Sequence, residues 1–162
     1  MDDEPRKSLD TRRQLAAEMG GAASVDKLHT RGKLTARERL DLLLDPGSFV
    51  EIGMLAHSQH ADLKDRTPAD GMLAGSGKID GRTVYITADD GTVLAGTRGR
   101  VAEVKNKRVR DLALKHEKPF IALMEAGAAR VQETYGATAA GLGYRFADHY
   151  RMSGSIPQVG AA

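Results

Sequence analysis

Four small residues, Ala126-Gly127-Ala128-Ala129, come directly after a short apolar run, Phe120-Ile121-Ala122-Leu123-Met124. The apolar run is typical of a strand that is buried on both faces. Small side chains let main-chain N–H groups approach a ligand closely, and a helical pattern follows. A strand, a small-residue turn and a helix together present free amides that can hold negative charge. The same pattern also fits a plain tight turn of an α/β protein.

Other groups of residues could also do chemistry. Lys105 and Arg108 lie one turn apart on a predicted helix. They could pair with phosphates or buried acids, or they could simply extend their charged ends into solvent. His57 and His60 lie near Asp62 on a predicted loop, but no fourth metal ligand accompanies them. The sequence therefore predicts no metal site.

Arg130 and Glu133 lie at the end of the small-residue segment. Opposite charges three residues apart can pair across one turn. We expect the pair to fix the turn, and the alternative is that Arg130 contacts a substrate.

Composition excludes several classes of protein. The chain has 162 residues, enough for one domain with a core. Its 24 basic and 22 acidic residues nearly cancel, which does not favour a nucleic-acid partner. The absence of cysteine rules out disulfides and thiolate chemistry. An acidic start and the lack of a long apolar run predict no signal peptide, no membrane association and a cytoplasmic location.

The N-terminal part reads as helical. The segment from Glu4 to about Lys27 predicts a surface helix that ends near Gly20-Gly21. Thr35-Ala36-Arg37-Glu38 is a capping box, and it predicts a helix that runs to Leu44. A strand over 49–52 and a polar loop over 57–70 are expected next.

The remaining pattern predicts a hairpin followed by alternating helices and strands. Strands at 72–79 and 82–88 flank Asp80-Gly81, which favours a two-residue turn. Helices are expected over 100–116 and 138–152, and strands at 120–124 and from Ile156. This order predicts parallel pairing of the later strands. The loops at 89–99 and 125–133 should then lie side by side at the carboxyl ends of their strands.

Several motifs resemble the carboxyltransferase (β) subunits of biotin-dependent acyl-CoA carboxylases, which include propionyl-CoA, acetyl-CoA and methylcrotonyl-CoA carboxylases. The likeness covers roughly residues 25 to 162. The longest motif is the run 31–51, R-G-K-L-T-A-R-E-R-L-D-L-L-L-D-P-G-S-F-V-E. The others are Asp80-Gly81-Arg82, Asp90-Gly91-Thr92-Val93, Asp111-Leu112-Ala113-Leu114, the segment 125–133 and Gly154-Ser155-Ile156-Pro157-Gln158.

The resemblance implies an α/β, crotonase-like (ClpP/crotonase) fold, incomplete, with an N-terminal helical extension. Residues 1–30 would form the extension and residues 31–162 part of the acyl-CoA carboxyltransferase N-terminal domain. By position, the backbone N–H groups of Gly127 and Ala128 would form the oxyanion hole that stabilises a thioester enolate. The resemblance and the charge pattern together make five residues candidates for substrate binding: Ala95, Gly96, Lys105, Arg108 and Arg130.

The resemblance also implies partners. Acyl-CoA would be the substrate, and carboxybiotin on a partner carrier protein would be the carboxyl donor. A biotin carboxylase subunit and a homo- or hetero-oligomeric assembly are expected with it. The half that handles biotin in such subunits has no counterpart in this sequence. The alternatives are therefore a non-catalytic interaction subunit or a truncated remnant.

The sequence departs from the family pattern near the expected site. Ala128 stands where the family has a second glycine, and alanine resists a positive φ. Gly91 replaces an aromatic residue, and Arg98 places a cation where an apolar residue is usual. The geometry of the oxyanion hole depends on how these residues fit.

Overall fold

The computed structural model describes residues 4–140 and 143–162. The α-helices are α1 (Glu4–Ala17), α2 (Ala22–His29), α3 (Ala36–Leu43), α4 (Arg100–Lys115), α5 (Val131–Thr134) and α6 (Tyr144–Met152). The strands are β1 (Val50–Glu51), β2 (Met72–Ile79), β3 (Arg82–Asp89), β4 (Phe120–Leu123) and β5 (Gln158–Ala161). Short 3-10 helices connect them: η1 (Ala61–Arg66), η2 (Pro68–Gly71), η3 (Leu94–Gly96) and η4 (Gly136–Ala139).

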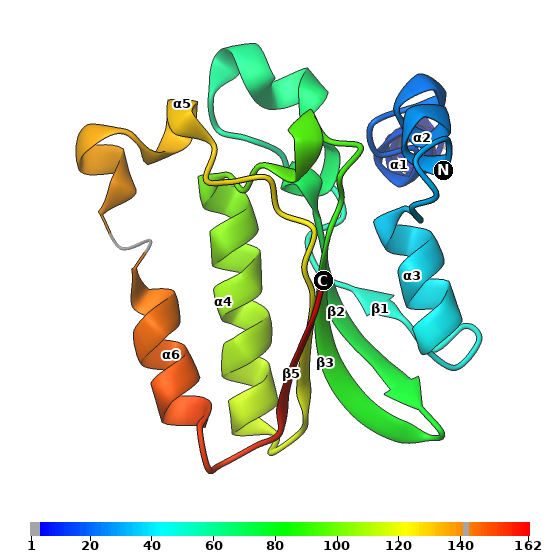
Figure 1. Cartoon of the computed structure of the whole chain (residues 1–162). Helices are drawn as coiled ribbons and strands as arrows, with labels where there is room; N and C mark the ends of the chain where they lie inside the picture. The colour runs from blue at the N-terminus through cyan, green and yellow to red at the C-terminus, as the bar shows by residue number, and fades with distance from the viewer. Residues whose placement is uncertain (1–3, 141–142) are drawn as a thin grey trace.

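The five strands form one mixed sheet in the order β1-β2-β3-β4-β5. The first three pair antiparallel, whereas β3-β4 and β4-β5 pair parallel. Helices α4 and α6 lie on one side of the sheet and α3 on the other (Figure 1). The parallel part brings the carboxyl ends of β3, β4 and β5 to the same edge.

Alternation along the strands builds a core on each face of the sheet. Leu73, Val84 and Ile86 pack with α3 in one cluster of buried side chains. Ala74 and Tyr85 belong to the other cluster, on the side of α4 and α6. The hairpin strands β2 and β3 thus have α3 on one face and α4 on the other, which fixes the register of the hairpin.

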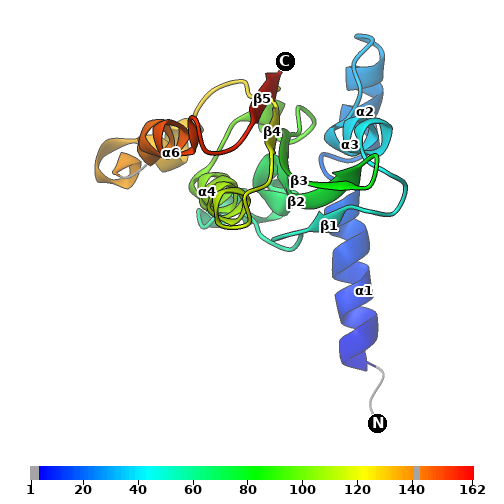
Figure 2. The ribbon, with the colours of Figure 1, turned by 90° about the horizontal axis from the view of Figure 1, so that it is seen from below.

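The N-terminal helices attach to this body at one main point. Met19 joins the α3-side core, and the Gly20 N–H donates to Thr92 Oγ1 at 3.1 Å. A Cβ at Gly20 would lie 2.0 Å from Thr92 O, so only glycine allows this approach. Helix α1 projects away from the sheet beyond this contact (Figure 2).

Several expectations are confirmed. The hairpin forms with Asp80-Gly81 as its turn, and both residues have positive φ (49° and 77°), as a primed turn requires. Helix α4 and the parallel pairing are also as expected. The capping box forms in full: the Glu38 N–H donates to Thr35 Oγ1 at 3.2 Å, and the Thr35 N–H donates to Glu38 Oε2 at 2.7 Å.

The segment 57–70 was expected to be a polar loop, and this is wrong. It folds into η1 and η2 and buries Ser58, Thr67 and Asp70 completely. These polar groups are satisfied internally: the Ser58 N–H donates to Thr67 Oγ1 at 2.9 Å, and Thr67 donates to Leu63 O at 2.8 Å. The segment therefore combines polar residues that are hydrogen-bonded inside the fold with exposed ones at 59–62 and 64–66.

Two other boundaries also differ. The strand expected at 49–52 is limited to Val50–Glu51. The helix expected over 138–152 begins only at Tyr144, after the 3-10 turn at 136–139; residues 141 and 142 of that range lie outside the described part. Gly141 and Gly143 in the sequence interrupt the helical pattern, because glycine costs helical stability.

The capping box gives a test of local stability. We expect Thr35→Ala to lower the free energy of unfolding by about 1 kcal/mol, because it removes the acceptor for the Glu38 N–H. Thr35→Ser keeps that oxygen and serves as the control. Urea unfolding of the two variants checks this, and an equal loss in both would contradict the role of the cap.

Candidate functional site

The loop after β3 and the loop after β4 lie side by side, as the parallel pairing predicted. Arg98 and Ala129 form a parallel bridge. The Arg98 N–H donates to Ala128 O at 2.9 Å, and the Arg130 N–H donates to Arg98 O at 2.8 Å. Backbone hydrogen bonds therefore join the two loops directly.

Two glycines allow the loops to approach so closely. A Cβ at Gly96 would lie 2.3 Å from Glu125 O, and a Cβ at Gly127 would lie 2.5 Å from Ala95 O. Leu94, Ala95 and Gly96 all have positive φ (44°, 56° and 71°), so they form one left-handed turn that faces Gly127. Such a turn of non-glycine residues is costly. The surrounding contacts must hold it in place.

The two N–H groups expected to form the oxyanion hole differ in whether they already have an acceptor. The Gly127 N–H donates to Gly96 O at 3.2 Å, so within this structure it serves the loop contact. The Ala128 N–H donates to no residue in the described part of the chain, and neither does that of Ala126. All three residues are exposed. A free donor is thus available at Ala128, while Gly127 is needed for the close approach.

The alanine at position 128 fits without strain. Neither Gly127 nor Ala128 has a positive φ, so the departure from a glycine pair costs nothing in the backbone. The expected helix directly after the small residues is absent, however. The chain leaves β4, reaches Arg130 without helical structure, and forms only the four-residue α5. The free amides therefore belong to the segment after the strand and not to a helix N-terminus.

A buried ionic cluster lies behind the two loops. Arg130 is only 2% exposed. Its Nη1 donates to Asp70 Oδ1 at 2.5 Å and to Glu133 Oε1 at 2.8 Å, and its Nη2 donates to Thr97 O at 2.9 Å. Arg130 therefore ties both loops to the η2 turn.

The two carboxylates of this cluster also cap α4. The Ala102 N–H donates to Asp70 Oδ2 at 2.7 Å, and the Arg100 N–H donates to Glu133 Oε2 at 2.8 Å. Acids are favourable at a helix N-terminus because its N–H groups lack partners within the helix. Ser58 adds a hydrogen bond to Glu133 Oε1 at 2.5 Å.

Burial acts on both acids, with opposite outcomes. For Asp70, burial raises the pKa despite the hydrogen bond and the charge of Arg130. For Glu133, burial alone would raise the pKa, but hydrogen bonds from Ser58, Arg130 and the Arg100 amide outweigh it and lower the pKa. The charged form of Glu133 is therefore stabilised by three donors drawn from three segments.

Arg130 and Lys105 were both candidates for substrate binding, and in this structure both side chains are buried and hydrogen-bonded within the protein. Arg130 is enclosed by the acids described above. Lys105 is 5% exposed, and its Nζ donates to Ala69 O at 2.8 Å and to Met72 O at 2.5 Å. These two hydrogen bonds hold the carbonyl groups at and next to the left-handed turn over 69–71. Neither side chain can reach a ligand at the surface.

Arg108 is exposed on α4, away from the loops' hollows. Val104 is exposed, and Asn106 and Arg110 are buried in its place. Polar groups can occupy the inner face because they have partners: Arg110 donates to Asn106 Oδ1 at 2.6 Å and to Asp148 Oδ2 at 3.0 Å.

Arg98, the unusual cation, also has a structural role. It binds Asp89 through two hydrogen bonds, from Nε at 2.8 Å and from Nη2 at 2.6 Å. Asp89 ends β3 and is 2% exposed. Burial would lower the pKa of Arg98, but the hydrogen bonds and charge of Asp89 raise it. Arg98 stays charged and closes the end of the strand.

A groove of about 1050 Å³ lies between the N-terminal helices and the η1–η2 segment. Five of its lining side chains are cations with no carboxylate partner among the described residues. They are Arg12, Lys27, Arg31, Lys64 and Arg66. Glu18 and Asp65 also line the groove, so it keeps an excess of positive charge suited to an anionic ligand.

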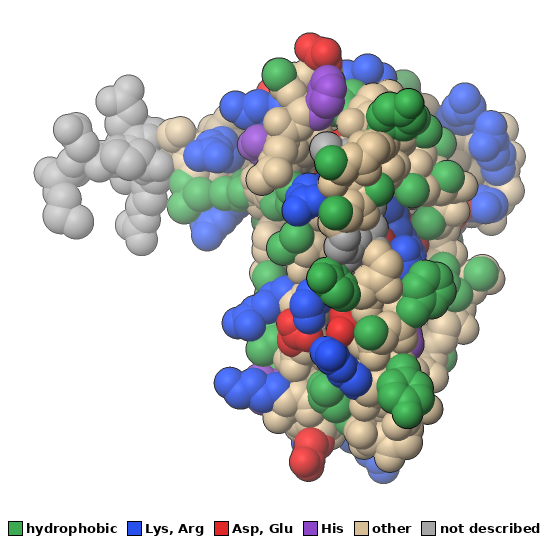
Figure 3. Space-filling model, turned by 90° about the vertical axis from the view of Figure 1, so that its left-hand side faces the viewer, with side chains coloured by type: hydrophobic (Ala, Val, Ile, Leu, Met, Phe, Trp, Pro, Cys, Tyr) green, Lys and Arg blue, Asp and Glu red, His purple; other side chains and the backbone are tan. Residues whose placement is uncertain are grey.

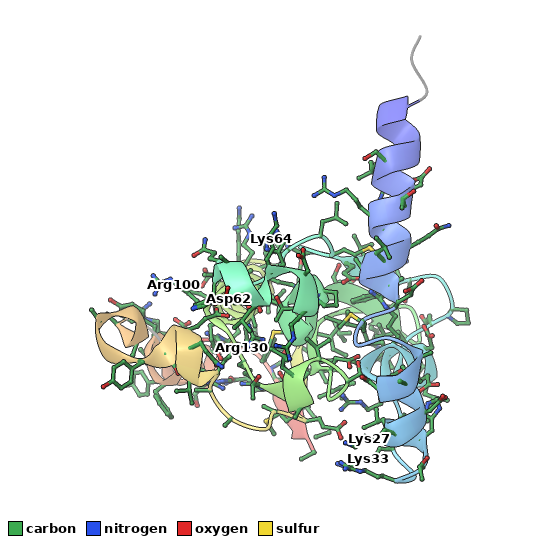
Figure 4. All side chains as sticks on the ribbon, turned by 90° about the horizontal axis from the view of Figure 1, so that it is seen from above. Lys27, Lys33, Asp62, Lys64, Arg100 and Arg130 are labelled. Atoms are coloured by element: carbon green, nitrogen blue, oxygen red, sulfur yellow. The ribbon has the colours of Figure 1, made fainter. Side chains whose placement is uncertain are left out.

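The groove runs on to the loop pair. A second hollow, of about 600 Å³, is lined by Ala126 and Gly127 and shares Arg31 and Ala95 with the groove. In Figure 4, Lys27 and Lys33 lie close together beside α2, and Lys64 lies apart from them on η1. Basic residues of the N-terminal extension thus face the site. Sequence reasoning missed them, although the four basic residues Arg12, Arg13, Lys27 and Arg31 were a visible signal.

No group of three or more side chains that could hold a metal ion occurs in the part of the chain that the structure describes. In the same residues, every helix is too short or too polar to cross a lipid bilayer.

Comparison with known proteins agrees with this architecture. Transcarboxylase 12S, solved as a hexamer with methylmalonyl-CoA and methylmalonic acid bound, superposes with a TM-score of 0.90 at 35% identity, over 99% of this chain and 32% of that one. The β subunit of P. aeruginosa geranyl-CoA carboxylase gives 0.75 at 30% identity, over 98% and 29%. The fold is therefore crotonase-like α/β.

The sequence comparisons identify the family. The chain belongs to the carboxyl transferase domain family, whose model matches residues 27–161. It is 40% identical to the propionyl-CoA carboxylase β chain of Roseobacter denitrificans, over 94% of this chain and 30% of the relative. The human mitochondrial β chain is 39% identical, over 93% and 29%. The resemblance seen in the sequence is confirmed, and the chain spans about 30% of the length of these relatives.

Lys105 gives a test by pH. Burial lowers its pKa from 10.5 to about 8 in the folded protein, although Glu51 and Asp70 act the other way. Between these two pH values the unfolded chain binds more protons, so the free energy of unfolding should rise with pH. The full contribution of this group is up to roughly 3 kcal/mol.

The measurement is urea unfolding at a series of pH values across this window. Lys105→Met should lack the rise, and Lys78→Met, at an exposed lysine of the hairpin, should keep it. Identical pH slopes for the native protein and Lys105→Met would show that Lys105 is not the group that titrates.

Proposed function

We propose that this chain is the acyl-CoA-binding part of a biotin-dependent acyl-CoA carboxyltransferase. The observation that carries the proposal is the groove of unpaired cations that leads to the two joined loops. Family membership supports it. The solved relative transcarboxylase 12S binds methylmalonyl-CoA, which is a ligand of the same chemical class.

Coenzyme A carries several phosphate groups at one end and the thioester at the other. Phosphates are bound by arginine and lysine side chains. Arg31 lines both hollows, and Lys27 and Arg12 line the groove beside it. In this proposal they bind the phosphates, while the thioester reaches the loops at Ala95, Gly96 and Gly127.

At the loops, the chain would stabilise the enolate formed when the α-carbon loses a proton. The Ala128 N–H is the donor we assign to the enolate oxygen, because it has no acceptor among the described residues. Gly127 would act mainly by letting the loops meet, and its own N–H would have to leave Gly96 O to donate to substrate. One such donor typically lowers the barrier by about 3 kcal/mol.

The other components would come from partners. Biotin attached to a carrier protein would supply the carboxyl group, and a biotin carboxylase subunit would load it. Parts of the protein or of the assembly beyond these 162 residues would complete the site, because relatives of this family are about three times as long. We propose a cytoplasmic complex in which this chain binds acyl-CoA.

The cation groove gives the first test. Arg31→Glu and Lys27→Glu should each weaken binding of propionyl-CoA by roughly 10-fold or more, since each replaces attraction to phosphate by repulsion. Arg82→Glu, at the exposed start of β3, is the matched control and should bind normally. Isothermal titration calorimetry at low salt measures the affinities. Equal affinity in all three variants would exclude the groove as the CoA site.

The oxyanion donor gives the second test. Ala128→Pro removes one N–H but keeps the carbonyl that accepts from Arg98. We expect it to weaken binding of a CoA analogue carrying a nitronate in place of the enolate by on the order of 100-fold. Binding of CoA itself should not change, and Ala128→Gly, which keeps the N–H, should bind both ligands normally.

The same experiment separates the alternative of a non-catalytic interaction subunit. One observation favours that alternative: the Gly127 N–H already has an acceptor. If Ala128→Pro binds the nitronate analogue as tightly as the native chain does, the amide has no oxyanion role, and the interaction subunit is the better description.

A further inference from the structure

The hollow beside the two loops has large apolar side chains in its wall. Leu28, Leu34 and Met124 line it together with Gly127. Leu34 and Met124 are 41% and 42% exposed, so much of their apolar surface is left open to a ligand. Ligand sites in proteins are concave and mostly apolar, with a few polar groups that orient the ligand. The wall of this hollow therefore suits an apolar group.

The charged side chains at the same hollow are largely paired with each other. Lys33 Nζ lies 2.8 Å from Glu125 Oε1, and Arg39 Nη2 lies 3.4 Å from Glu125 Oε2. Figure 4 shows Lys33 beside α2, at the edge of the N-terminal helices. Arg31 also lines the hollow, and it is the cation assigned above to the phosphates. The remaining wall favours an uncharged ligand group.

Gly91 keeps part of this hollow open. It lies in the wall of both the hollow and the cation groove. A Cβ at Gly91 would lie 3.5 Å from Glu125 Cδ and 3.6 Å from Leu28 Cδ1, which is ordinary contact. A larger side chain would therefore take up the space beside Leu28 and Glu125.

The backbone does not require glycine at this position. Gly91 has no positive φ, so other residues could adopt its conformation. The motif resemblance predicts an aromatic residue here, and its ring would fill part of the hollow. The effect of Gly91 is therefore on the space available to a ligand and not on the fold of the loop.

The hollow adjoins the place assigned to the thioester. Ala95 and Gly127, where the thioester would lie, both line it, so an acyl chain that extends from the thioester enters the hollow. Its volume is about 600 Å³, within the roughly 300–1,000 Å³ of pockets that enclose drug-sized ligands. A propionyl group, with three carbon atoms, leaves most of this space empty.

We propose that Gly91 determines substrate specificity, and that this chain binds apolar, straight acyl chains longer than propionyl. The chain of the substrate lies against Leu28, Leu34 and Met124, in the space that Gly91 leaves open. This inference rests on the proposed function, because it places the thioester at the two loops.

The experiment compares propionyl-CoA with hexanoyl-CoA by isothermal titration calorimetry on the full chain. Each fully buried methylene lowers Kd by about fourfold. Hexanoyl-CoA has three more methylenes, and we expect its Kd to be at least roughly 10-fold lower. Equal Kd values would overturn the inference and leave the proposed function intact, whereas no binding of either ligand would overturn both.

Gly91→Phe should reduce the preference for hexanoyl-CoA to about threefold or less, because the ring takes the space of the added methylenes. The readout is the ratio of the two Kd values, in which a change in binding of the CoA part cancels. Gly143→Phe is the matched control: a Cβ there meets nothing within 4 Å, and the residue has a φ of −75°. It directly precedes α6, on the side of the molecule that Figure 3 shows, opposite α2 and α3. This control should keep the preference.

Leu34→Ser tests the hollow without a change at Gly91. It removes apolar wall from a side chain that is already part-exposed, and it should also lower the ratio by about threefold. Leu42→Ser, at a residue that is 76% exposed on α3, should leave the ratio unchanged. A native ratio in both Gly91→Phe and Leu34→Ser would place the acyl chain outside this hollow and overturn the inference.

Discussion

The site depends on one buried guanidinium. Arg130 bonds Asp70 and Glu133, and both acids in turn accept from the first turn of α4. A helix, a left-handed turn and two loops therefore share a single hydrogen-bonded centre. A buried charge of this kind is favourable only when every partner is in place. The ionic cluster of Arg130, Asp70 and Glu133 fixes the two loops to the rest of the fold. The position of the free Ala128 N–H therefore depends on this cluster.

Much of the fold could be read from the sequence, since local chemistry determines it. The Asp80-Gly81 turn, the capping box at Thr35 and the apolar run at Phe120 each state a backbone preference that the structure keeps. The side-by-side loops followed from strand order alone. These features require only neighbours along the chain and the handedness of crossovers.

The contacts between segments that lie far apart in the sequence could not be predicted. Asp70 lies 60 residues from Arg130, and nothing local shows that a polar stretch with Pro68 will be buried beside it. Lys105 looked like a cation available to phosphate, but its amine binds two carbonyls inside the protein. Three of the five unpaired cations that line the groove, Arg12, Lys27 and Arg31, come from the N-terminal segment, and the other two, Lys64 and Arg66, come from η1. Partners across the fold decide whether a charge is structural or free.

The groove has one wall on the N-terminal helices and the other on the η1–η2 segment. These helices join the body mainly around Met19 and Gly20. An anion that spans both walls would therefore act as a clamp, since any ligand bound only by the docked arrangement stabilises that arrangement by mass action. Occupancy of the groove and docking of the N-terminal helices thus form one linked equilibrium, in which cellular concentration of the anion sets how firmly the extension is held.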